Sequence, residues 1–280
     1  MNWPRIIKKY FNGKYITILL NKLFFIFLIL SLLICKIYES NFGHIHKYEN
    51  NLIHIDSIKS MKKVVYTVLF GNYDKIRTIN KEKGYDYIMI TDQNLTHKRT
   101  NWTIINVEPN LDYSNIIDVF KKQRFYKTHP HLFFKDYNIS IYIDSTFLIK
   151  GNLDEFLLRI LTKNLSIYIL EHPNRNSINN EFEAVLRVKK DSKENIEFIK
   201  KRYNKEEYPD NNGLSENCLI IRKHNDLKCI NLMNQWFYEI KHYSYRDQVS
   251  LNYIIWKTNN TNVKYQKKCY PNILFRIQLI

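Results

Sequence analysis

The chain has 280 residues, of which 45% are hydrophobic and 15% aromatic, so it carries enough apolar side chains for a packed core and is not expected to be disordered. Its net charge of +16 would suit a nucleic-acid partner, but six basic residues precede the first acidic one, Glu39, and no basic cluster is interleaved with a recognisable binding motif. We therefore expect no nucleic-acid partner. Four cysteines are too few for a disulfide scaffold, and the three beyond Cys35 (Cys218, Cys229 and Cys269) permit one bridge and one free thiol.

The first feature along the chain is an apolar segment, ITILLNKLFFIFLILSLLIC at 16–35. It has about the length that spans a bilayer core. Its uninterrupted part, 23–35, also suits a signal peptide, but no small-x-small cleavage site follows. Because basic residues cluster before it, the positive-inside rule predicts a cytoplasmic tail (1–15), a transmembrane signal anchor (16–35), a stalk (36–61) and a globular domain (62–280). We predict a single-pass type II protein of an ER/Golgi-type membrane, with its domain in the lumen.

The domain alternates apolar runs with helical patterns. Strands are predicted at 64–70, 85–91, 102–107, 139–144, 165–170 and 216–222. Helical patterns cover 114–134 (until Pro130), 152–161, 179–205, 226–243 and 246–257. This alternation predicts a mostly parallel α/β sheet flanked by helices. With only six glycines, the chain has no glycine-rich phosphate loop.

Ligands of such sheets bind beyond the carboxyl ends of the strands. The polar residues that end the predicted strands are therefore the candidates for a site. They are Asn72 to Asp74, Asp92, Asp144 and Glu171 to Arg175.

Seven segments occur in the order of a known family. They are YTVLFGNYD (66–74), YDYIMITD (85–92), KKQRFYKTHPH (121–131), SIYIDSTFLIKGNL (140–153), EHPNR (171–175), GLSENCLIIRKHND (213–226) and YRDQVSLNYIIWK (245–257). Over roughly 62–275 the chain resembles the glycosyltransferase-like family first catalogued as a domain of unknown function. Members include plant proteins linked to cell-wall mucilage and bacterial proteins of surface-polysaccharide loci. The resemblance implies a GT-A-like, Rossmann-type fold, a nucleotide-sugar donor (UDP- or GDP-sugar) and a glycan, glycoprotein or glycolipid acceptor.

The resemblance also implies a divalent metal, Mn²⁺ or Mg²⁺, because a departing nucleoside diphosphate gains negative charge. Similar enzymes hold it with Asp-x-Asp after an apolar strand. Here Asp144 occupies the first position and Thr146 the second, which puts metal dependence in doubt. Asp144 is the candidate metal ligand, and capping of the strand is the alternative.

Further residues are candidates for the nucleotide. Arg124, Lys127 and His131 lie three or four residues apart on one helical face and could meet the diphosphate, unless that face is simply solvated. His172 and Arg175 follow the next strand and could serve phosphate or metal. A nucleoside diphosphate is expected between Phe70, Gly71, Asp74, Asp92, Arg124 and Asp144, with Asp92 at the base or ribose.

Two carboxylates are candidates for the chemistry. Asp247 opens a helix, where it could face the sugar or act as a cap. Glu216 adjoins the strand at 216–222 and could contact donor sugar or acceptor; either could be the base that an inverting reaction needs. The prediction is a membrane-anchored glycosyltransferase. The alternative is an inactive GT-A-like module that binds a glycan or assembles with another transferase.

Overall fold

The computed structural model describes residues 55–71, 76, 78–95, 100–107, 116–149, 152–161, 164–266 and 275–276. All lie in the second of two units of the chain, Ile53–Ile280. The predicted cytoplasmic tail and anchor fall outside the described residues. Among the residues that are described, no helix is long and apolar enough to cross a bilayer.

The centre of the fold is a seven-stranded sheet with strand order β3-β2-β1-β4-β7-β6-β8. Its strands are β1 (Lys63–Leu69), β2 (Tyr85–Thr91), β3 (Thr103–Asn106), β4 (Ile139–Ile143), β6 (Ile167–Glu171), β7 (Ser215–Arg222) and β8 (Val263–Gln266). Neighbours are parallel except that β7 runs antiparallel to both β4 and β6. The predicted mostly parallel α/β sheet is therefore confirmed. A second sheet, β5 (Leu148–Ile149) with β9 (Phe275–Arg276), was not predicted.

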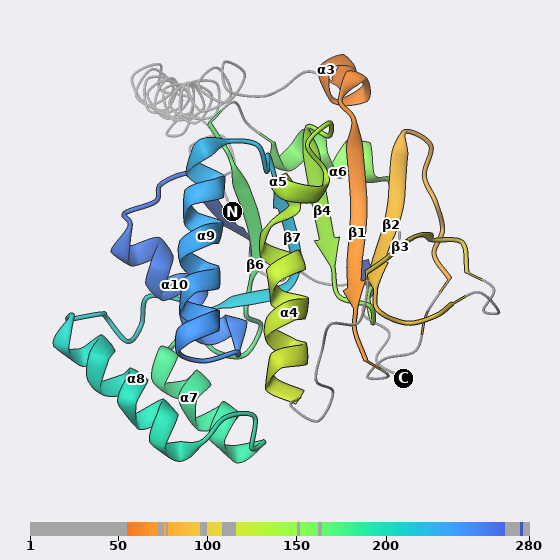
Figure 1. Ribbon diagram of the computed structural model, residues 1–280. Coiled ribbons are helices and arrows are strands. Elements are labelled where there is room, and N and C mark those ends of the chain that lie inside the picture. Colours follow the sequence, from red (N-terminus) through yellow and green to blue (C-terminus); the bar gives the residue numbers. More distant parts are fainter. Residues whose placement is uncertain are drawn as a thin grey trace, which may run out of the picture. The chain divides into compact units, whose positions relative to one another are not determined.

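Helices cover both faces of the large sheet. They are α3 (Ile55–Ser60), α4 (Ile116–Thr128), α5 (Pro130–Phe133), α6 (Leu153–Ile160), α7 (Ile178–Arg187), α8 (Lys193–Lys205), α9 (Leu227–His242) and α10 (Asp247–Lys257). Figure 1 shows α4 and α9 in front of the sheet and α6 behind it. Proline has no N–H, so Pro130 starts a new helix rather than continuing α4. The helical stretch 179–205 is divided by a turn at Lys189, whose φ is 52°.

Two apolar cores fix this arrangement. Side chains alternate along β1: Val64, Tyr66 and Val68 pack into the core shared with α7 to α10, whereas Val65 and Leu69 pack into the core shared with α3 and α6. Every residue of β1 is buried, as expected of a parallel strand covered on both faces. Cys218 and Cys229 belong to different cores and are not joined by a disulfide, and Cys269 lies outside the described residues.

The amino-terminal limit of the packed region differs from the predicted stalk. Residues 55–60, which we assigned to the stalk, form α3, and Ile58 within it is fully buried against the core that includes α6. By contrast, the edge strand β3 is largely exposed, although its sequence is apolar. Trp102, just before β3, supplies the buried contact there.

Candidate functional site

One edge of the sheet gathers the predicted site residues. Strands β1, β2, β4 and β6 end at this edge, and the antiparallel strand β7 begins there. The Asp144 N–H donates to the Cys218 carbonyl at 2.9 Å, and the His172 N–H donates to the Leu214 carbonyl at 2.7 Å. The start of β7 therefore lies between the ends of β4 and β6.

A cleft of about 250 Å³ opens at this edge beside β1, β4 and α4. Among the described residues that line it, Asp144 is the carboxylate, and Arg124, Lys190 and Arg246 are the basic residues. Phe120 and Tyr245 also line it, with rings stacked at 5.4 Å between centroids and 4° between planes. The part of the lining that the structure describes thus combines basic side chains, the carboxylate of Asp144 and an aromatic wall.

Asp247 is the hub of a buried ion-pair cluster beneath the cleft. It is the first residue of α10, as predicted, but it is only 3% exposed. Its Oδ2 accepts a 2.6 Å hydrogen bond from the Lys127 Nζ and lies 3.3 Å from the Arg124 Nε. Burial alone would raise the pKa of Asp247, but Arg124, Lys127 and Arg246 together hold it well below its usual value. A carboxylate with so low a pKa is a weak base.

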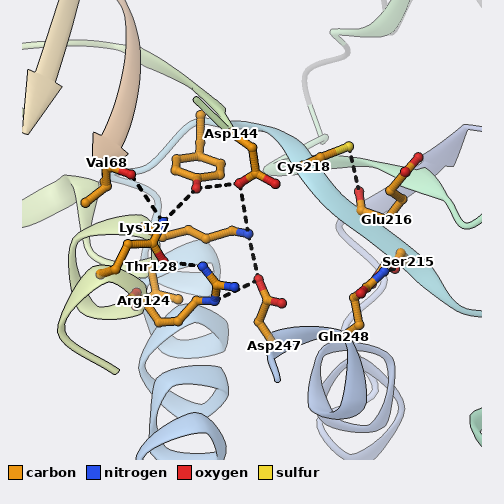
Figure 2. Close-up of polar contacts among 12 residues, drawn as sticks. Val68, Arg124, Lys127, Thr128, Asp144, Ser215, Glu216, Cys218, Asp247 and Gln248 are labelled. Atoms are coloured by element: carbon orange, nitrogen blue, oxygen red, sulfur yellow. Dashed lines mark hydrogen bonds and ion pairs between the residues drawn. The ribbon is translucent and has the colours of Figure 1, made fainter. Parts of the chain in front are cut away.

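Lys127 points inward rather than toward a ligand. Its side chain is 2% exposed, and its ammonium lies 4.7 Å from the ring centroid of Tyr142. The same ammonium lies 3.8 Å from Asp144 Oδ1, so it lies between the carboxylates of Asp144 and Asp247 (Figure 2). Arg124 shares this helical face but also lines the cleft. His131, predicted on the same face, belongs to α5 instead, because α4 ends at Thr128.

Asp144 is held at the cleft by a tyrosine. The Tyr142 hydroxyl donates to Asp144 Oδ1 at 2.6 Å, and the Gln123 amide donates to the tyrosine oxygen at 3.1 Å. Burial, together with the charge of Asp144, raises the pKa of Tyr142 well above 10. The tyrosine therefore remains a donor. The side chain of Asp144 is 39% exposed and reaches the cleft.

The predicted nucleotide residues of β1 and β2 lie at the same edge. Phe70 lines the cleft. Next to it, the N–H of Gly71 donates to both carboxylate oxygens of Asp92, at 3.0 and 3.1 Å. The φ of Gly71 is +62°, a conformation that favours glycine. Asp92 therefore fixes the turn after β1, and Asp74 lies outside the described residues.

His172 and Arg175 are engaged within their own loop and α7. The His172 Nδ1 accepts hydrogen bonds from the N–H groups of Asn174 and Arg175, at 3.2 and 3.0 Å. The Arg175 guanidinium donates to Glu181 Oε2 through Nε at 2.8 Å. Burial raises the pKa of Glu181, although Arg175 and Arg246 oppose the shift. The structure does not bring His172 or Arg175 into the lining of the cleft.

Glu216 lies on β7 at the same edge of the sheet but apart from the ion-pair cluster. Figure 2 shows it beside Cys218, away from the chain of contacts that joins Asp144, Lys127 and Asp247. Its side chain is half-buried, and it is not part of the cleft lining. Gln248, next to Asp247, donates a 3.4 Å hydrogen bond to the carbonyl of Ser215 and so ties α10 to the start of β7.

Sequence reasoning missed six residues that the site uses: Phe120, Gln123, Tyr142, Lys190, Tyr245 and Arg246. Gln123 and Arg246 are direct neighbours of predicted residues, and Tyr142 lies two residues before Asp144, on the same face of the strand. Lys190 gave no signal, because only the turn between α7 and α8 brings it to the cleft.

The sequence profile of the TOD1/MUCI70 glycosyltransferase-like domain matches residues 49–277. The chain belongs to this family. No curated protein matches it. Among solved structures, the chain resembles the apo form of WbbM, a bifunctional glycosyltransferase, with 16% identity and a TM-score of 0.44, covering 74% of this chain and 39% of that one. It also resembles the apo form of mouse xyloside xylosyltransferase 1, with 7% identity and a TM-score of 0.41, covering 73% of this chain and 84% of that one. The chain thus spans well under half of WbbM.

Proposed function

We propose that this glycosyltransferase-like chain transfers a sugar from a nucleoside-diphosphate donor, a UDP- or GDP-sugar, to a glycan, glycoprotein or glycolipid. One observation carries the proposal: Asp144 shares a cleft with Arg124, Lys190 and Arg246 beside an aromatic wall. Arginine and lysine bind phosphate oxygens, and cations fixed near a leaving diphosphate stabilise its developing charge. Phe120 and Tyr245 offer flat apolar surface for a base or a sugar ring.

Arg246 is the strongest candidate for the diphosphate among these cations. It lines the cleft, and its Nε is buried without a hydrogen-bond partner in the described part of the chain. A buried N–H group without a partner is costly, and an anion in the cleft would satisfy it. Arg124 already faces Asp247, so it is oriented before the ligand arrives.

The residues present fit a divalent metal held by one protein carboxylate. Among the described residues, no three His, Cys, Asp or Glu side chains gather into a metal cluster. Mg²⁺ and Mn²⁺ accept oxygen ligands, and Mg²⁺ sites often use one or two carboxylates together with substrate phosphates and water. Asp144 would be the protein ligand here. A bound metal would supply positive charge at the leaving diphosphate.

For an inverting reaction, the base is better sought at Glu216 than at Asp247. Asp247 is buried and paired with two cations, which favours a role in positioning Arg124 and Lys127. Glu216 is half-buried at the same edge of the sheet. A carboxylate in that setting can accept the proton of an acceptor hydroxyl.

The cellular setting is also a proposal. The basic flank and apolar run at 16–35 support a type II signal anchor, with the domain in the lumen of an ER/Golgi-type membrane. Protease treatment of intact microsomes tests this, because digestion of the domain without detergent would overturn it.

The enzymatic proposal is tested by a donor screen with the full-length protein, with and without Mn²⁺. We expect release of UDP or GDP from one donor sugar nucleotide, and weaker nucleotide binding by Arg246→Ala. The alternative, an inactive module for glycan binding or assembly, is favoured if a glycan binds but no sugar nucleotide binds or turns over.

A further inference from the structure

Tyr142 connects Asp144 to the interior of the protein. Residues two apart on a strand share a face, so the tyrosine ring lies beside the carboxylate that follows β4. Its hydroxyl donates to Asp144 Oδ1 at 2.6 Å, while the Gln123 Nε2 donates to the same hydroxyl oxygen at 3.1 Å. Gln123 Nε2 also lies 3.4 Å from the Val68 carbonyl. The hydroxyl is thus held from both sides.

A buried cation competes for the same carboxylate. The Lys127 Nζ lies 3.8 Å from Asp144 Oδ1 but only 2.6 Å from Asp247 Oδ2. An ion pair at that distance strengthens as water is excluded, so a free Asp144 side chain would turn inward toward Lys127. The Tyr142 hydroxyl donates to that same oxygen at the shorter distance of 2.6 Å, and Asp247 supplies the close partner of the lysine.

We propose that Tyr142, supported by Gln123, is a positioning residue that holds Asp144 by Oδ1 and keeps Oδ2 turned to the cleft as a single-oxygen ligand for a divalent metal. Both side-chain contacts recorded for Asp144 with the described residues use Oδ1. The inference deepens the proposed function and rests on it.

The test is Tyr142→Phe in the full-length protein, which removes one hydroxyl and keeps the buried ring. Outer-sphere partners of metal ligands are worth about 10- to 100-fold in metal affinity or activity. We therefore expect Mn²⁺ to bind the UDP complex at least tenfold more weakly by calorimetry. UDP affinity in EDTA should be unchanged, and kcat should fall while the KM for the acceptor stays constant.

The matched control is Tyr203→Phe. Tyr203 is also buried, and its hydroxyl donates to the Val249 carbonyl at 3.3 Å, so this variant loses a tyrosine hydrogen bond outside the cleft. A general loss of packing would affect both variants alike, whereas the positioning role affects Tyr142→Phe alone. Gln123→Met removes the amide that donates to the Tyr142 hydroxyl oxygen. It should lower Mn²⁺ affinity as Tyr142→Phe does, but by less, and it replaces Tyr142→Phe as the test if that variant does not fold.

The outcomes separate the two proposals. Unchanged Mn²⁺ affinity in Tyr142→Phe, with tight binding by the unmodified protein, overturns the positioning role and leaves the proposed function intact. Failure of the unmodified protein to bind Mn²⁺ with either UDP or GDP, while it still turns over a sugar nucleotide, overturns the metal ligand and with it this inference. Failure to bind any sugar nucleotide overturns the proposed function itself.

Discussion

Replacing Asp247 with asparagine tests the buried ion-pair cluster beneath the cleft. The substitution keeps the shape of the side chain but leaves the buried Lys127 and the partly buried Arg124 without this anionic partner. Removing one member of a buried ion pair costs about 3 to 5 kcal/mol. In a domain of this size each kcal/mol lowers the Tm by about 2 to 4 °C, so the expected fall is on the order of 10 °C.

The same ion-pair cluster also predicts the direction in which stability changes with pH. The pKa of Asp247 is lowered in the folded chain from the usual 3.8. Its contribution to the free energy of unfolding is therefore complete above that value and is lost as the pH falls below it. Urea denaturation of the unmodified protein should show this acid loss between pH 4 and pH 2. Asp247→Asn should be less stable at neutral pH and flatter across that range.

Glu239→Gln is the matched control. Glu239 is another buried carboxylate, and it pairs with Arg202 between α8 and α9, outside the cleft lining. Both variants should lose stability, but only Asp247→Asn should lose turnover, by about a hundredfold, because misplaced positioning groups cost that much. Equal stability of Asp247→Asn and the unmodified protein would refute the energetic argument. Equal loss of turnover in both variants would refute the positioning role.

Three further results are expected. Asp144→Asn should lower turnover of the sugar nucleotide about a thousandfold in initial-rate assays, because it removes the proposed metal ligand; activity that survives both this change and EDTA would disprove the metal. Arg246→Ala should weaken UDP binding by about 10- to 100-fold in calorimetry and leave uridine binding unchanged, as a phosphate contact requires. Ile58→Ala should cost about 2 to 5 kcal/mol in urea denaturation, whereas the exposed Lys59→Ala should change little, because only Ile58 fills the core.

The sequence predicted the strands and helices of the sheet more fully than it predicted the site. Apolar runs such as 64–70 predict buried strands because covered parallel strands have no polar face. An apolar run could not show that β7 runs antiparallel, because a buried strand has the same apolar pattern whichever way it runs in the sheet. The short strands β5, β8 and β9 carry too few residues for any period to be visible.

The sequence predicted those residues of the candidate site whose place depends on a single strand or helix. Asp144 follows a strand and Asp247 opens a helix, and both lie where those patterns predict. Helical spacing also placed Arg124 and Lys127 on one face, but spacing does not reveal what that face meets. Because α4 packs against β1 and α9, Lys127 is buried and pairs with Asp247. Lys190 and Arg246 come from separate elements, so only the tertiary fold unites them with Asp144.

The charged residues around the cleft form two layers, an inner one centred on Asp247 and an outer one in the lining of the cleft. In the inner layer, Asp247 pairs with Lys127 and with Arg124, so the charge of the buried Lys127 is largely compensated within the protein, whereas Arg124 also lines the cleft. In the outer layer, Lys190 and Arg246 accompany Asp144, and basic side chains outnumber acidic ones among the described residues of the lining. A diphosphate in the cleft would meet these basic side chains directly, with or without a metal on Asp144. Such attraction is screened by salt, so raising the ionic strength should raise the KM for the donor. Arg246→Ala should flatten that dependence, since it removes one of the charges responsible, and a salt response identical to that of the unmodified protein would place the diphosphate elsewhere.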